Sequence, residues 1–180
     1  VQQDFLNRSN IGAIFVNRQG SGGFSGNSDY GRSYAVDGRL GIGQQGTISG
    51  FAAGTQTPDI KDGTQAYDLT GRYDTAQYRV TLGYTEVGPN FNPEVGFYSR
   101  RGLRRLNSQV YTRFRPENVL GMHEIRPHVN HFTIWNFETG QQESQFTHID
   151  THWEWQNGYE VHTGLNVFKE GVLVPFEMFP

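Results

Sequence analysis

Apolar and polar side chains alternate with a period of two along most of the chain. In the clearest segment, Tyr34, Val36 and Leu40 lie on one side of the backbone, and Ser33 and Asp37 lie on the other. Period two is typical of β-strands, because successive side chains of an extended backbone point to opposite faces. The same alternation recurs in further segments: residues 67–73, 78–85, 148–155 and 159–167. Helical periodicity is almost absent, so the pattern predicts an all-β fold.

Other segments are less regular. Residues 9–18 carry apolar side chains on both faces, and residues 47–56 consist mainly of small residues. Residues 123–137 alternate at first and then change phase near Phe132. A β-bulge near Phe132 would explain this change, because an extra residue in one strand shifts all later side chains to the other face. Together the segments predict about nine strands.

The connections between these segments alternate in length. Long connections cover residues 19–31, 57–64, 88–104 and 138–144. Shorter ones lie at residues 44–46, 74–76 and 157–158, and residues 115–118 open another fairly short one. An antiparallel up-and-down meander with short turns at one end and long loops at the other is typical of outer-membrane barrels. We therefore predict an all-β, antiparallel up-and-down meander that forms part of a transmembrane β-barrel, with short turns towards the periplasm.

Aromatic side chains gather near the ends of the predicted strands. Tyr73 and Tyr78 flank one short turn, and Trp155 and Tyr159 flank another. Such rings suit the two water–lipid interfaces, where the ring is buried and its polar tip stays hydrated. A soluble sandwich or barrel whose aromatic face packs inward would show the same alternation, so that alternative stays open.

Composition narrows the classes of protein that fit. The 180 residues are 35% hydrophobic, 14% aromatic and 18% charged, and the aromatic content argues against disorder. No apolar run approaches the roughly 18 residues of a membrane-spanning helix. A net charge of −3 argues against nucleic-acid binding, and the absence of cysteine excludes disulfides and cysteine-ligated zinc. Low hydropathy with many aromatics agrees with a barrel whose lumen is polar.

Two runs of residues resemble one bacterial family. Residues 90–97 (NFNPEVGF), which precede an arginine-rich stretch, and residues 8–18 (RSNIGAIFVNR) are similar to an uncharacterised domain that follows a carbohydrate-binding family-9-like domain in secreted proteins. Residues 34–38 (YAVDG) match its next strand. The resemblance implies an outer-membrane β-barrel longer than this chain and without an established activity. Residues 1–180 would then be one incomplete barrel segment, an internal fragment without a signal peptide.

The resemblance and the pattern together imply a location and partners. We expect the protein in the bacterial outer membrane, in contact with outer-membrane lipid and with the rest of the same barrel. Other outer-membrane proteins and polysaccharide are further candidate partners. The barrel would act as a channel, an anchor or an assembly partner, with a link to carbohydrate capture.

Histidines and carboxylates share one face of the predicted strand 148–155. His148, Asp150, His152 and Glu154 alternate there, and neighbouring strands add further groups of the same kind: Glu124, His128, Glu160 and His162. Imidazole and carboxylate suit zinc or a similar ion, although same-face residues about 7 Å apart along a strand make it hard for His148 and His152 to share one. A polar, hydrogen-bonded lumen wall is the favoured interpretation. We therefore predict no cofactor and keep His128, His148, His152 and His162 only as candidate metal ligands.

The same carboxylates allow an enzymatic alternative. Asp150 with Glu160, or Glu124 with Glu154, would suit a glycosidase if the two carboxyl groups lay roughly 5–9.5 Å apart. Ion pairs with Arg126 or Arg79 are the favoured role for these residues, so we assign no catalytic residue. A soluble all-β carbohydrate-active enzyme stays open as the alternative function.

The loop 88–104 is strongly basic. It leads into four arginines and contains aromatic residues that would anchor it: Arg100, Arg101, Arg104 and Arg105, with Phe91 and Phe97. These side chains are the candidate ligand-binding residues, because guanidinium groups bind acidic polysaccharide or phosphate. Alternatively, the arginines pair with carboxylates inside the barrel as the loop folds inward. A non-catalytic binding barrel that uses this loop is the third function left open.

Overall fold

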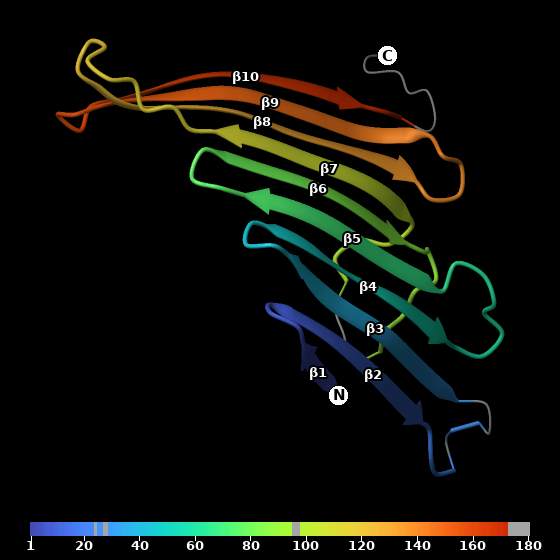
Figure 1. The fold of residues 1–180 in the computed structure, drawn as a ribbon. Coiled ribbons are helices and arrows are strands. Elements are labelled where there is room, and N and C mark those ends of the chain that lie inside the picture. Colours follow the sequence, from blue (N-terminus) through green and yellow to red (C-terminus); the bar gives the residue numbers. More distant parts are fainter. Residues whose placement is uncertain (24, 27–28, 95–97, 173–180) are drawn as a thin grey trace, which may run out of the picture.

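The computed structural model describes residues 1–23, 25–26, 29–94 and 98–172, and it holds one antiparallel sheet (Figure 1). The sheet has ten strands, and their order across the sheet is their order along the chain. The strands are β1 (Gln2–Phe5), β2 (Ser9–Gln19), β3 (Tyr30–Ile42), β4 (Gly46–Gln56), β5 (Gln65–Asp74), β6 (Tyr78–Val87), β7 (Leu103–Thr112), β8 (Met122–Asn136), β9 (Gln142–Trp155) and β10 (Glu160–Glu170). The prediction of an all-β, antiparallel, up-and-down meander is confirmed.

The sheet is open. Over the described residues, β1 pairs only with β2 and β10 pairs only with β9, so each has one unpaired edge. No helix in the described part of the chain has the length and apolar character needed to cross a membrane.

The strand count and the connections differ from the prediction. β1 was missed because its four residues, QQDF, carry no apolar alternation, although they pair with residues 9–12 of β2. The connection between β7 and β8 covers residues 113–121 and includes residues 115–118, which were predicted to open a fairly short link. It also exceeds the 137–141 connection between β8 and β9, so the alternation of short and long connections fails at this point.

A register shift lies close to Phe132, between Ile134 and Trp135, but it does not cause the phase change in the sequence. The β8–β9 ladder continues through the Phe132–Phe146 pair, and its register shifts lie between Met122 and Glu124 and between Ile134 and Trp135. Phe132 keeps its phase and lies on the same face as Phe146, with ring centroids 5.6 Å apart. The apolar pattern therefore changes because aromatic rings occupy positions on the otherwise polar face.

Strand register gathers the large apolar side chains on one face of the sheet, called here the apolar face. Val36 pairs with Ala13 and Ala52, Val80 pairs with Tyr73 and Val110, and corresponding pairs continue across β8–β10. Most large side chains on this face are exposed: Ile11, Phe15, Tyr34, Val36, Leu40, Ile42, Ile48, Tyr67, Leu69, Tyr73, Tyr78, Val80, Leu82, Tyr84, Val110, Val129, Ile149, Val161, Leu165 and Val167. No other layer of the described chain covers them.

The opposite face, called here the polar face, carries most of the charged groups and also the small core. Ala66, Val87 and Phe91 are buried there, and Phe51, Ala53 and Tyr98 pack around them. Ile14 and Phe168 are exposed apolar exceptions on this face. The core forms because residues 88–94 and 98–102 of the β6–β7 connection fold over the sheet, and their yellow-green parts lie behind β3–β5 in Figure 1.

Candidate functional site

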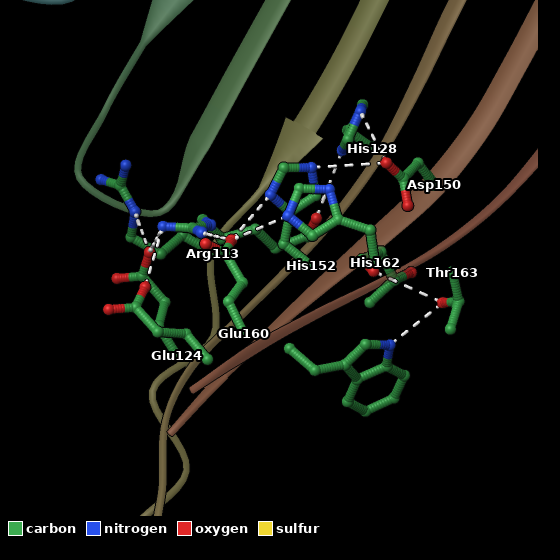
Figure 2. A network of polar contacts seen from close by, with 12 residues as sticks. Arg113, Glu124, His128, Asp150, His152, Glu160, His162 and Thr163 are labelled. Carbon is green, nitrogen blue, oxygen red and sulfur yellow. Dashed lines mark hydrogen bonds and ion pairs between the residues drawn. The ribbon is translucent and has the colours of Figure 1, made fainter. Parts of the chain in front are cut away.

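Titratable side chains concentrate on the polar face of β8, β9 and β10. The register aligns them in rows across these strands: Glu124 with Glu154 and Glu160, Arg126 with His152 and His162, and His128 with Asp150. Directly paired side chains of antiparallel strands lie on the same face and touch their diagonal neighbours. Residues up to 38 positions apart in the chain are thereby brought into one network (Figure 2).

Three imidazoles surround one carboxylate oxygen, Asp150 Oδ2. The Nε2 atoms of His152, His148 and His128 lie 3.3, 3.6 and 4.0 Å from it. The Asp150 side chain is only 8% exposed and that of His128 11%. The other carboxylate oxygen, Asp150 Oδ1, is buried and has no hydrogen-bond partner among the described residues. We call these four residues the histidine cluster.

Each histidine of the cluster is oriented by its other ring nitrogen. The Nδ1 atom of His148 lies 2.6 Å from Asn166 Oδ1, that of His152 lies 3.0 Å from Glu160 Oε1, and that of His128 lies 3.3 Å from the Arg126 carbonyl oxygen. Because these partners are oxygen acceptors, each Nδ1 donates its proton to one of them. In a neutral ring with this arrangement, the Nε2 atom that faces Asp150 carries the lone pair.

A second group lies beside the cluster. His152, Glu160 and His162 place one ligand atom each within 4.8 Å of one another, and His162 Nε2 is 3.3 Å from Glu160 Oε1. This group is more open, because the His162 side chain is 54% exposed and that of Glu160 37%. Glu160 also forms an ion pair with Arg126, so its charge is already balanced.

Arg126 is the centre of an ion-pair network rather than a free cation. It contacts Glu124, Glu154 and Glu160, and Glu124 also accepts hydrogen bonds from Arg113 and Arg115 at 3.1 and 2.9 Å. Three of the four carboxylates considered for a glycosidase, Glu124, Glu154 and Glu160, therefore pair with Arg126, as predicted. This pairing leaves neither an unpaired acid nor an unpaired base at Glu124, Glu154 or Glu160. Asp150 contacts histidines instead, and Arg79 pairs with Asp74.

The arginines in and directly after the long loop do not converge on one point. Arg100 pairs with Glu143, and Arg101 Nη2 lies 3.5 Å from Asn92 Oδ1. Arg104 and Arg105 are neighbours in β7 and so point to opposite faces. These last two have separate partners: Arg104 pairs with Glu86 at 3.0 Å on the apolar face, and Arg105 lies 5.0 Å above the Phe132 ring on the polar face. The stretch is basic in sequence, but its charges are distributed over several partners.

The long loop is anchored to the polar face. Phe91 is buried and meets Tyr98 edge to face, with ring centroids 5.8 Å apart, and burial raises the pKa of Tyr98. The backbone N–H of Asn92 donates to Thr55 Oγ1 at 3.1 Å, and Ser33 Oγ donates to the Pro93 carbonyl at 2.8 Å. Phe97, the other aromatic candidate, lies outside the described residues.

No family model, curated protein or solved structure matches this chain. The resemblance drawn from residues 8–18 and 90–97 therefore stays a prediction.

Several contributors to the site carried no signal in the sequence. Asn166 and the Arg126 carbonyl orient two histidines, but only the register of β8–β10 brings them within reach. Arg113 and Arg115 lie in the β7–β8 connection and reach Glu124. His131 is the opposite case, a histidine of the same strand as His128 that does not contribute to the site. It faces the apolar side, where it contacts Thr147 at 2.8 Å and Thr133 at 3.0 Å.

Proposed function

We propose that this chain is a segment of a bacterial outer-membrane β-barrel that acts as a channel, anchor or assembly partner. The observation that carries the proposal is the apolar face. Exposed Tyr, Val, Leu and Ile side chains from nine of the ten strands lie on one side of a continuous meander. Soluble monomers rarely expose apolar patches larger than a few hundred Å². Lipid would cover such a surface, which supports the proposal.

The position of the aromatic rings on the apolar face supports the same conclusion. Tyr34, Tyr67 and Tyr84 lie towards the ends of their strands that lead to the long loops, and Tyr73 and Tyr78 flank the β5–β6 turn. Aliphatic side chains fill the middle of the strands. Two aromatic girdles with an aliphatic band between them are typical of transmembrane barrels.

The polar face supplies what a lumen would need. It carries the ion-pair network, the histidine cluster and the docked loop 88–102. In hydrocarbon every backbone hydrogen-bonding group must be paired, so the free edges of β1 and β10 require further strands to complete the barrel. The docked loop would occupy part of the lumen beside β2–β5 and leave the side lined by β8–β10 more open.

Site-directed spin labelling tests the lipid-facing assignment, and the chain has no cysteine that would interfere. Single cysteines at Val80, Leu82 and Val110 sample the apolar face, and those at Thr81 and Gln109 are matched controls on the polar face. In the full-length protein in lipid vesicles, we expect labels at the first set to collide with dissolved oxygen. Labels at the second set should collide with a water-soluble nickel chelate.

The outcomes separate the candidate functions. If the apolar-face labels reach neither probe and the protein purifies as a monomer without detergent, another protein layer covers that face and the soluble alternative replaces this proposal. If both sets reach the nickel chelate equally, the apolar face is not in lipid.

A further inference from the structure

We infer that the histidine cluster, His128, His148, Asp150 and His152, is a binding site for one divalent transition-metal ion, with zinc as the reference ion. The cluster lies on the polar face, so the inference holds whether lipid or protein covers the apolar face. Metal binding is also a separate property from the ion pairs of the Arg126 network and from the docking of the long loop.

The separations of the ligand atoms fit a single ion. Ligands bound about 2.0–2.1 Å from a tetrahedral zinc ion lie about 3.4 Å from one another. The ligand atoms of His128, Asp150 and His152 all lie within 4.8 Å of one another, and the Nε2 atoms of His152 and His128 lie 3.3 and 4.0 Å from Asp150 Oδ2. His148 is outside this mutually close group, but its Nε2 atom lies 3.6 Å from the same oxygen, so it would join as the fourth ligand. His148 and His152 reach the same oxygen because both side chains lean along the strand towards Asp150, which lies between them.

The ring nitrogens are oriented as metal ligands require. A metal-bound histidine donates its other N–H to a carbonyl or carboxylate, which fixes the ring and leaves a lone pair for the ion. All three cluster histidines have such a partner on Nδ1: Asn166, Glu160 and the Arg126 carbonyl. With neutral rings, the Nε2 lone pairs would be directed at an anionic oxygen, and a cation between them would convert that repulsion into attraction.

The buried carboxylate adds an independent observation. Asp150 Oδ1 is buried without a hydrogen-bond partner among the described residues, and an ionised carboxylate in that state is costly. A divalent cation beside Oδ2 would balance the charge of the whole carboxylate. Burial also shields the site, whereas the neighbouring group of His152, Glu160 and His162 is open and includes a carboxylate that Arg126 already neutralises.

The set of donors selects the kind of ion. Three imidazole nitrogens and one carboxylate oxygen suit Zn²⁺, Co²⁺ or Ni²⁺. Calcium and magnesium prefer six or more oxygen ligands, so they should not compete.

Metal titration of the detergent-solubilised full-length protein tests the site, after treatment with a chelator. We expect one Zn²⁺ per chain by calorimetry, and Co²⁺ should give the intense visible absorption of a tetrahedral nitrogen–oxygen site. An excess of Ca²⁺ should leave both signals unchanged. His128→Ala, His152→Ala and the nearly isosteric Asp150→Asn should each weaken zinc binding by at least about tenfold. This is the lower end of the loss in metal affinity that follows removal of residues that only hydrogen-bond to the ligands, and these three are ligands themselves.

Two histidine variants serve as controls. His131→Ala changes a histidine of the same strand that faces the apolar side, and it should leave zinc affinity within about twofold of the parent. His162→Ala removes a residue of the neighbouring group alone and should behave likewise. The inference is overturned if the parent protein binds no zinc, if Asp150→Asn binds it as well as the parent, or if binding is lost in His162→Ala but kept in His128→Ala.

Discussion

Leu82 offers the sharpest test of where the apolar face lies. Its side chain is 56% exposed in the middle of β6, and its register partners on that face are Gly71 and Ser108. In water, Leu82→Arg would lose about 1 kcal/mol at most, because full burial of a leucine side chain contributes about 1.5–3 kcal/mol and less than half of this one is buried. At the midplane of a bilayer, arginine costs about 2–4 kcal/mol. The lipid-facing position therefore predicts a roughly 30-fold to 900-fold decrease in the folding equilibrium constant.

Reversible unfolding in urea, followed by tryptophan fluorescence in lipid vesicles, measures this free energy. Thr70→Arg is the matched control, because Thr70 pairs with Gly83, the neighbour of Leu82, at the same depth on the polar face. It lies between Asp68 and Arg72 on that face, and we expect a change within about 0.5 kcal/mol. If both variants changed the free energy of unfolding equally and by less than about 1 kcal/mol, Leu82 would be facing water and the reasoning would fail.

Further substitutions test other parts of the structure. Phe91→Ala removes the buried ring that anchors the long loop, so proteolysis in residues 88–102 should accelerate while the strands stay protected, and cleavage at the parent rate would contradict the docking. Arg126→Met leaves Glu124, Glu154 and Glu160 without their shared cation and should lower the free energy of unfolding by about 1–3 kcal/mol in urea, whereas no change would show that the network does not stabilise the fold. Trp153 lies on the apolar face and donates to Thr163 at 3.0 Å, so brominated lipid should quench its fluorescence. Trp135 lies on the same face, so Trp153→Phe should lower the quenched fluorescence without abolishing it, and unchanged quenching would contradict a lipid-facing Trp153.

Alternation predicts the strands well where one face is apolar and the other polar. Residues 33–40 and 78–85 illustrate this, because each apolar position there has a polar neighbour in sequence. β1 escapes prediction because QQDF has a single apolar side chain, and its place depends on pairing with β2. At Phe132 the pattern is misleading, because this apolar side chain lies on the polar face. Its packing against Phe146 on that face explains its position, and the sequence does not show this contact.

The candidate site was predictable in its residue types but not in its geometry. Period two places His148, Asp150 and His152 on one face, as the structure also has them. Alternation gives no register between strands, so it could not place His128 opposite Asp150 or Asn166 beside His148. The spacing of the arginines in the sequence predicted one basic patch. In the structure, Arg104 and Arg105 are neighbours in β7 and point to opposite faces of the sheet.

The docking of the long loop has a consequence for the order of folding. Each strand pairs with its neighbour in sequence, whereas the loop contacts Ser33 and Arg18 across 60 and 76 residues of chain. Contacts over long separations close larger chain loops and form late, after the local hairpins exist. The hairpins of β8–β10, which carry the histidine cluster, therefore form through contacts over shorter sequence separations than the docking of the loop does. The polar face of β2–β5 remains open to water until the final step, and the small core beneath Phe91 closes last.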